Sequence, residues 1–183
     1  KVLSIGTRPD CISEAVCELL ARYAEEREVW VELGLQTASD SVARAINRGY
    51  DLSAFENAVA YLRKYRLKFV VHMIIGLPSD DAEGVKRTAE YIAKIKPFGV
   101  KIHSIYVMEG TILAKMYREK RYTPPTVDEY AGLAAYTLSV MPSNVVIHRV
   151  TGDCPRDLLV APDWNKDKNA IIERINERLK KHE

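Results

Sequence analysis

The chain has 183 residues, of which 27 are basic, 25 are acidic and 47% are hydrophobic. A net charge of +2 argues against generic attraction to nucleic acid or acidic membranes, and the hydrophobic content argues against disorder. No apolar run approaches the roughly 20 residues that span a bilayer, and no signal peptide opens the sequence. Composition therefore predicts a globular domain of the cytoplasm.

In chain order, strand-like runs are predicted at 2–8, 29–36, 68–75, 100–107 and 145–149. Apolar residues at helical spacing predict helices near 12–23, 40–46, 53–62, 82–92, 112–119, 126–141 and 171–179, with an irregular stretch at 151–164. Thr126 and Glu129 have the spacing of a capping box. Strand and helix alternate about every 30 residues, which favours a parallel sheet with helical crossovers and leaves doubly wound sheet and barrel open.

The two faces of these strands differ in character. One face is apolar: it carries Leu3 and Ile5 in the first strand, Val31, Leu33 and Leu35 in the second, and Val100 and Ile102 in the fourth. The other face is polar or glycine: it carries Ser4, Gly6 and Arg8 in the first strand, Glu32, Gly34 and Gln36 in the second, His72 in the third, and Lys101 and His103 in the fourth. A doubly wound sheet is apolar on both faces, and an ordinary eight-stranded barrel fills its interior with Val, Ile and Leu. The pattern therefore predicts a parallel barrel with a ligand inside. The alternative is a buried ion network in which the glycines only ease packing.

Several short segments are similar to motifs of a known protein family. They are SIGTRPDC (4–11), ELGLQT (32–37) with NRG (47–49), HMIIGLP (72–78), VMEGT (107–111) and HRVTGDCPRDLLVAPDW (148–164). In this order they resemble the radical SAM superfamily, and within it the YhcC-like Fe–S oxidoreductases and their elongator-type relatives. The resemblance implies an α/β fold, a partial TIM-type barrel to which this chain contributes the third to sixth strands. Residues 1–125 would be the C-terminal portion of that barrel, and residues 126–183 a helical extension packed on it.

In such enzymes a [4Fe–4S] cluster with one open iron binds S-adenosylmethionine (SAM), whose reductive cleavage gives a 5′-deoxyadenosyl radical that abstracts hydrogen from the substrate. This sequence has no C-x-x-x-C-x-x-C motif, and Cys11, Cys17 and Cys154 match no metal-binding spacing. It also begins at Lys1 in a strand-like run. We therefore expect a C-terminal fragment of a radical SAM oxidoreductase that holds no metal, retains neither cofactor stably and is inactive alone.

The resemblance implies SAM contacts at Gln36, Arg48, His72, Gly76, Leu77 and Met108. Arg48 would hold the methionine carboxylate, His72 would replace an aspartate that binds the ribose, and Gly76 and Leu77 would lie near the adenine. The alternative for Arg48 is an arginine that satisfies a helix C-terminus. For Met108 the alternative is ordinary packing.

Predicted substrate contacts are Arg8, Glu32, Lys101 and His103 in the barrel and His148 and Arg149 in the extension. Basic groups near an acid suit a carboxylate or phosphate. The predicted partners are the missing N-terminal part of the barrel and a second copy paired through the edge of the first strand. The net charge gives no support for tRNA. Two other readings stay open: a non-catalytic partial barrel that binds nucleotides or anions, and an unrelated enzyme with Lys101 as a Schiff-base amine.

Overall fold

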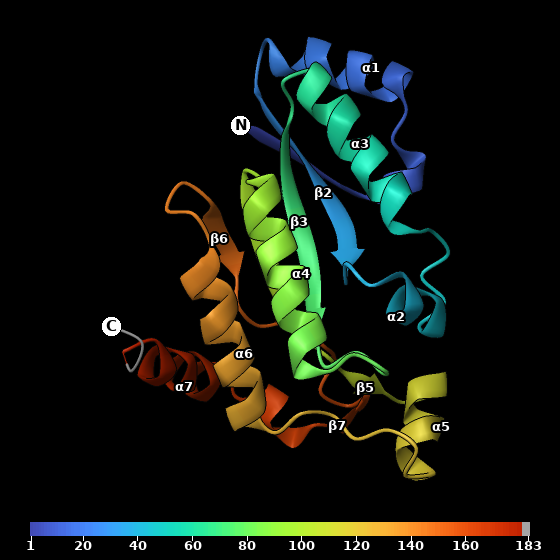
Figure 1. The fold of residues 1–183 in the computed structure, drawn as a ribbon, viewed down its shortest axis with the longest axis vertical. Coiled ribbons are helices and arrows are strands. Elements are labelled where there is room, and N and C mark those ends of the chain that lie inside the picture. The colour runs from blue at the N-terminus through green and yellow to red at the C-terminus, as the bar shows by residue number, and fades with distance from the viewer. Residues whose placement is uncertain (181–183) are drawn as a thin grey trace.

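The computed structural model describes residues 1–180, and its centre is a sheet of five parallel strands in those residues. The strands are β1 (Val2–Thr7), β2 (Glu28–Gln36), β3 (Lys68–Ile75), β4 (Gly99–Ser104) and β6 (Val146–Arg149). Their order is β1-β2-β3-β4-β6, and every pair is parallel. Within residues 1–180, β1 and β6 form two open edges, so the sheet is a barrel that is not closed (Figure 1). The predicted partial barrel is confirmed.

Helices cover one side of this sheet (Figure 1). The helices that pack on it are α1 (Glu14–Ala24), α3 (Leu52–Lys64), α4 (Ala82–Ile95) and α6 (Val127–Val140). The short α2 (Asp40–Ala45) follows β2, α5 (Ile112–Arg118) packs on β5, and α7 (Lys168–Leu179) packs on α6. Most begin where a side-chain oxygen accepts a backbone N–H of the first turn, such as Ser13 for α1 and Asp51 for α3. The capping box predicted at Thr126 and Glu129 is confirmed at the start of α6. Short polar residues thus set the helix boundaries.

The predicted difference between the two faces is confirmed in β2. Val31, Leu33 and Leu35 are fully buried beneath the helices, whereas Glu32 and Gln36 on the other face are partly exposed. Each such buried aliphatic side chain contributes about 1.5–3 kcal/mol through removal from water. The core therefore lies on the helix side, and the polar face is free to serve another purpose.

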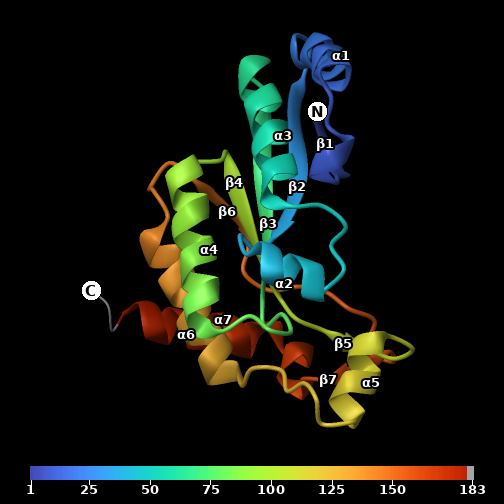
Figure 2. The same ribbon diagram turned by 45° about the vertical axis from the view of Figure 1, so that its right-hand side comes forward.

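The strand predicted at 100–107 is wrong in extent, because β4 ends at Ser104. Residues Val107–Met108 form a separate strand, β5, which pairs antiparallel with β7 (Leu159–Ala161) in the stretch that was predicted to be irregular. The buried Asn165 fixes the bend: it accepts from the Ser104 hydroxyl at 2.7 Å and donates to the Ile105 carbonyl at 2.8 Å. Figure 2 shows β5, β7 and α5 together beyond the carboxyl end of the sheet.

The C-terminal segment does more than pack on the outside. β6 pairs with β4, in the register Val100 with Ile147 and Lys101 with Arg149, so a strand from beyond residue 126 completes the sheet. Residues 181–183 of the predicted extension lie outside the described residues. The division of the chain at residue 125 stays a prediction.

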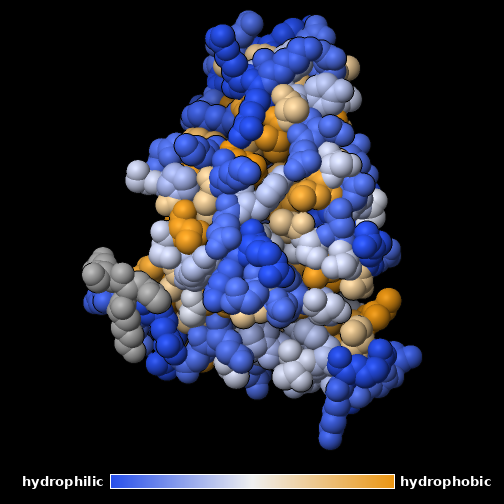
Figure 3. Space-filling model, in the orientation of Figure 1, coloured by the Kyte–Doolittle hydropathy of each residue, from blue (hydrophilic) through white to orange (hydrophobic). Residues whose placement is uncertain are grey.

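The side shown in Figure 3 is mainly hydrophilic, with small, separate hydrophobic spots. None of the helices in residues 1–180 is long and apolar enough to cross a bilayer.

Gly99→Ala is expected to lower the free energy of unfolding by about 1–3 kcal/mol. A Cβ at Gly99 would lie 2.4 Å from Cδ2 of His148 and 2.9 Å from the carbonyl oxygen of Val146, which belongs to the adjacent strand and cannot move away freely. Urea unfolding followed by tryptophan fluorescence measures the change. The control is Gly132→Ala within α6, where a Cβ meets nothing within 4 Å. That variant is expected to gain about 0.5–1 kcal/mol, and equal effects of the two substitutions would contradict the argument.

Candidate functional site

The polar face of the sheet carries its side chains in layers, because parallel pairing sets equivalent positions side by side. Glu32 lies beside Gly6 of β1, and His72 lies between Gly34 of β2 and Lys101 of β4. The glycines add no side chain to these layers, and a Cβ at Gly6 would meet nothing within 4 Å. The structure therefore brings together three predicted site residues from three strands, beside open space.

Glu32 is the centre of this group. Its carboxylate accepts a hydrogen bond from Lys101 Nζ at 2.5 Å, from Ser4 Oγ at 2.6 Å and from His72 Nε2 at 2.7 Å. Its side chain is 15% exposed. Burial opposes ionisation, but the hydrogen bonds from Lys101, Ser4 and His72 outweigh it and lower the pKa of Glu32 to about 2. The carboxylate is thus ionised and held by three donors at neutral pH.

A second imidazole continues the chain of contacts. Nε2 of His103 lies 3.2 Å from Nδ1 of His72, and the two rings stack with centroids 5.0 Å apart. Burial, together with the charges of His72, Arg149 and Lys101, lowers the pKa of His103 to about 4. Burial also lowers the pKa of His72, against the hydrogen bond to Glu32. Both rings are therefore neutral at pH 7.

Arg149 and His148 occupy different places. Arg149 pairs in register with Lys101 and belongs to the same layer. His148 instead lies edge-on to Trp30 and Phe98, with ring centroids 5.4 Å and 5.7 Å away, at the amino end of the strands. Among the described residues, Nε2 of His148 and Nε1 of Trp30 are buried without a hydrogen-bond partner. This aromatic layer closes the amino end of the polar face.

At the carboxyl end, the predicted residues Arg8 and Gln36 gather around Tyr50. The Arg8 guanidinium lies 5.4 Å from the centre of the Tyr50 ring and forms a bidentate ion pair with Asp10. A Cβ at Gly34 would lie 2.7 Å from Nε2 of Gln36 and 3.2 Å from the Tyr50 hydroxyl. Arg8 therefore lies apart from the Glu32 group, and Tyr50, which no motif singled out, forms part of the rim.

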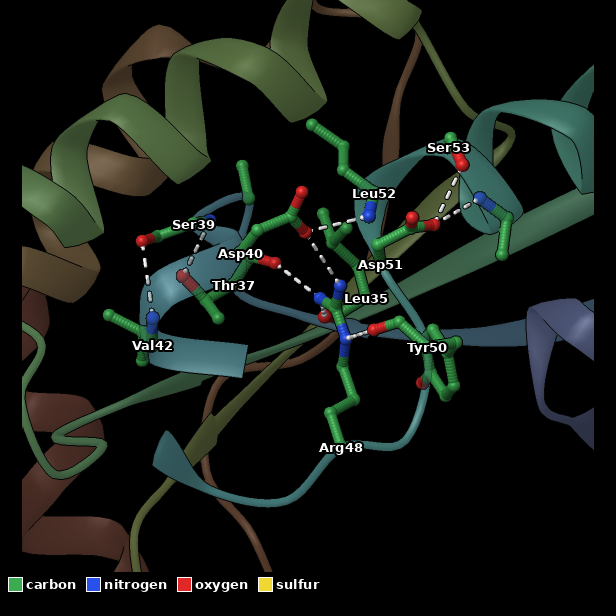
Figure 4. Close-up of polar contacts among 12 residues, drawn as sticks. Leu35, Thr37, Ser39, Asp40, Val42, Arg48, Tyr50, Asp51, Leu52 and Ser53 are labelled. Carbon is green, nitrogen blue, oxygen red and sulfur yellow. Dashed lines mark hydrogen bonds and ion pairs between the residues drawn. The ribbon is translucent and has the colours of Figure 1, made fainter. Parts of the chain in front are cut away.

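Arg48 is almost wholly buried, with 3% of its side chain exposed. Its Nη1 donates to the carbonyls of Leu35 and Thr37, each at 2.7 Å, and its Nε donates to the carbonyl of Tyr50 at 3.0 Å (Figure 4). Its Nη2 lies 3.4 Å from Asp40. The guanidinium therefore ties the end of β2 to the loop before α3, and its donors are largely occupied.

The remaining predicted SAM contacts are dispersed. Gly76, at φ +96°, ends β3 and accepts a hydrogen bond from the Tyr122 hydroxyl. Gly76 and Leu77 line a cavity of about 500 Å³ at the N-terminal ends of α4 and α6. Met108 lies in β5, paired with Leu159. Asp80 lines the same cavity, and burial, with the charge of Asp81, raises its pKa to about 6. Asp80 is not among the predicted site residues.

The cysteines do not fit an iron–sulfur cluster. Cys17 is fully buried in α1, Cys11 is exposed, and Cys154 lies in the loop before β7. Burial raises the pKa of Cys17 and of Cys154, which disfavours the thiolate that iron requires. Within residues 1–180 no group of three or more His, Cys, Asp or Glu side chains could hold a metal ion.

Comparison with known proteins shows which family the chain belongs to. Residues 1–92 match the radical SAM superfamily, and residues 97–181 match the radical SAM C-terminal domain. The uncharacterized protein YtqA of Bacillus subtilis is 36% identical over 97% of this chain, and YhcC of Escherichia coli K12 is 33% identical over 98%. The chain covers 55% and 59% of those two proteins.

A solved structure agrees with the sequence relatives. Elp3 of Methanocaldococcus infernus, with its N-terminus deleted, superposes with a TM-score of 0.81 at 25% identity; the match covers 97% of this chain and 42% of that one. An unrelated barrel enzyme is thereby excluded. The chain belongs to the radical SAM superfamily, in the group that includes YhcC, YtqA and Elp3.

Proposed function

We propose that the polar face of the sheet is the wall of a chamber in which a radical SAM enzyme binds SAM and its substrate. The observation that carries the proposal is the group of Glu32, His72 and Lys101, which lies on the face opposite the helices. Bound SAM would supply a 5′-deoxyadenosyl radical, which abstracts hydrogen from the substrate. The protein's own part is to hold both molecules against the polar face and away from bulk water.

We propose further that the cluster is held by residues outside these 183. The sequence has no C-x-x-x-C-x-x-C motif, and the chain spans little more than half the length of YtqA and YhcC. The open edge of β1 supports this, since an unpaired strand edge is a template for another strand. Near it, Val16, Leu19 and Tyr23 of α1 are 37%, 45% and 46% exposed, an apolar stripe suited to a neighbouring element.

For SAM, we propose contacts from Gln36 and His72 on the polar face and from Gly76, Leu77 and Met108 beyond its carboxyl end. The contact of His72 is made by its ring carbons, because both of its ring nitrogens already have hydrogen-bond partners. Arg48 enters this proposal through the loop that it holds, because its donors already bind three carbonyls. The substrate contacts proposed are Glu32, Lys101, His103, Arg149, Arg8 and His148. A tRNA substrate, pairing of two copies through β1 and a location in the cytoplasm remain predictions.

The test compares this chain with a longer product of its gene. The chain alone, treated with iron and sulfide under reducing conditions, is expected to keep no stable cluster absorbance and to form no 5′-deoxyadenosine from SAM. A longer product that carries C-x-x-x-C-x-x-C is expected to do both, and mutation of those cysteines to alanine is the control. Cluster retention by the 183 residues would overturn the proposal. A longer product that forms a cluster but leaves SAM intact would favour a non-catalytic binding module.

A further inference from the structure

The hydrogen-bond partners of the stacked rings of His72 and His103 determine which ring nitrogen carries the proton. A carboxylate only accepts hydrogen bonds, so the 2.7 Å contact with Glu32 fixes the proton of His72 on Nε2. The neutral ring then has its lone pair on Nδ1. That lone pair accepts from Nε2 of His103 at 3.2 Å, which fixes the proton of His103 on Nε2 as well. Glu32 thereby sets the tautomer of a ring two contacts away.

The end of this chain of contacts is an acceptor. With its proton on Nε2, the neutral His103 has a lone pair on Nδ1, and this atom makes no hydrogen bond to any group in residues 1–180. It is also absent from the buried unpartnered atoms, which in those residues are Trp30 Nε1 and His148 Nε2. Nδ1 of His103 is therefore an accessible hydrogen-bond acceptor with a defined direction.

A cation lies in the same layer of the face. Arg149 pairs in register with Lys101, and its charge acts on both His72 and His103. The Lys101 ammonium is bound to Glu32, whereas the nearest acid to Arg149 is Asp153 at 3.9 Å. Asp153 has a closer partner in Lys168. The Arg149 guanidinium, 40% exposed, is therefore free to bind an anion.

We propose that the polar face binds a small organic anion that carries a hydroxyl group, the anion on Arg149 and the hydroxyl donating to Nδ1 of His103. Toward this hydroxyl, Glu32 and His72 are positioning residues, since they act on it only through the tautomer of His103. This inference deepens the proposed function, because it names the class of substrate that the chamber takes: a hydroxy acid or a phosphorylated polyol.

The first experiment determines the tautomers of His72 and His103. Long-range ¹H–¹⁵N spectra of the histidine rings at pH 7 are expected to show His72 and His103 as neutral rings with the proton fixed on Nε2. In His72→Phe the stacked ring stays, but His103 loses its acceptor and is expected to show a mixture of tautomers. A mixture for His103 in the unaltered chain, or no change in His72→Phe, would overturn the inference.

The second experiment measures binding by titration with four probes. Glycerate and glycerol 3-phosphate carry a hydroxyl group; their counterparts, acetate and inorganic phosphate, lack an alcohol group. A hydroxyl hydrogen bond is worth up to about 1.5 kcal/mol, so each hydroxylated probe is expected to bind about tenfold more tightly than its counterpart and to shift the His103 Nδ1 signal. His103→Phe is expected to abolish this preference, and Arg149→Met to weaken all four probes alike. Arg174→Met, at an exposed position of α7, is the control and keeps the affinities.

Comparison of the two hydroxylated probes separates the carboxylate from the phosphate as the preferred anion. Equal affinities for hydroxylated and plain probes, or no binding to the unaltered chain, would refute this inference. Such a result leaves the formation of 5′-deoxyadenosine by the longer gene product untouched, so the two proposals fail separately.

Discussion

Replacing Arg48 with methionine is expected to lower the free energy of unfolding by about 3–5 kcal/mol, because it removes the donors from buried acceptors without replacing them. The carbonyls of Thr37 and Tyr50 would lose a charged partner, and so would the carbonyl of Leu35, which also accepts from the N–H of Thr37 at 2.8 Å. Methionine fills much of the same space, so the loss reflects hydrogen bonding more than a cavity. Urea unfolding followed by circular dichroism measures it.

Arg44→Met is the matched control for this prediction. Arg44 lies in the last turn of α2, four residues earlier, and its side chain is exposed. A surface substitution of this kind changes stability by no more than about 0.5 kcal/mol. If Arg48→Met were as mild as Arg44→Met, the carbonyl contacts of Arg48 would not be holding the end of β2 as we describe.

Acidification from pH 7 to pH 4 is expected to destabilise the folded state through His103 by about 2–3 kcal/mol. The pKa of this imidazole is about 4 in the folded protein, against 6.5 when exposed, so between these values the unfolded chain binds a proton that the folded chain does not. Stability therefore falls as the pH falls through this window and changes no further below it. His103→Phe removes this titration.

Other groups titrate nearby. Asp80 acts in the opposite direction, because its folded pKa is about 6 against 3.8, so the folded state gains a proton first and stability rises as the pH falls from 6 to 3.8. Glu32, with a folded pKa of about 2 against 4.5, contributes stability above pH 4.5 that is lost between pH 4.5 and 2. Comparison of variants with the unaltered chain isolates each contribution.

The measurement is the free energy of urea unfolding at pH 7, 5.5 and 4. The stability of His103→Phe relative to the unaltered chain is expected to rise by about 2–3 kcal/mol from pH 7 to pH 4. The relative stability of Asp80→Asn is expected to fall over the same range. A His103→Phe curve parallel to that of the unaltered chain would show that the imidazole titrates as though exposed.

The spacing of apolar residues predicted the helix-covered side of the sheet well, because the side chains that this side buries follow a local pattern in the sequence. Val31, Leu33 and Leu35 could be assigned to the core, and Thr126 and Glu129 to a helix start, since these patterns are local. The end of β4 could not be found in the same way. The sequence from Val100 to Val107 is strand-like throughout and contains no residue that signals a break. The bend after Ser104 depends on Asn165, about 60 residues further along.

The site was predictable in part for the same reason. Alternation put Glu32, His72 and Lys101 on one face, and the structure joins them within hydrogen-bond distance. Their partners were less accessible to sequence reasoning. The stacking of His103 on His72 depends on the register between β3 and β4, and the part played by Tyr50 at the rim depends on a loop whose path no motif specifies.

The contacts of Asn165 bear on the order in which the chain folds during synthesis. A ribosome releases Ser104 and Ile105 long before β6 and Asn165 emerge. Until then the amino half of β4 lacks its neighbouring strand, and the carboxyl end of β4 lacks its amide partner. Contacts that join such distant residues form late, because loop closure must precede them. The segment that carries β6 and Asn165 thus joins β4 after the earlier strands have been made, and the polar face takes its final shape only once that segment is present.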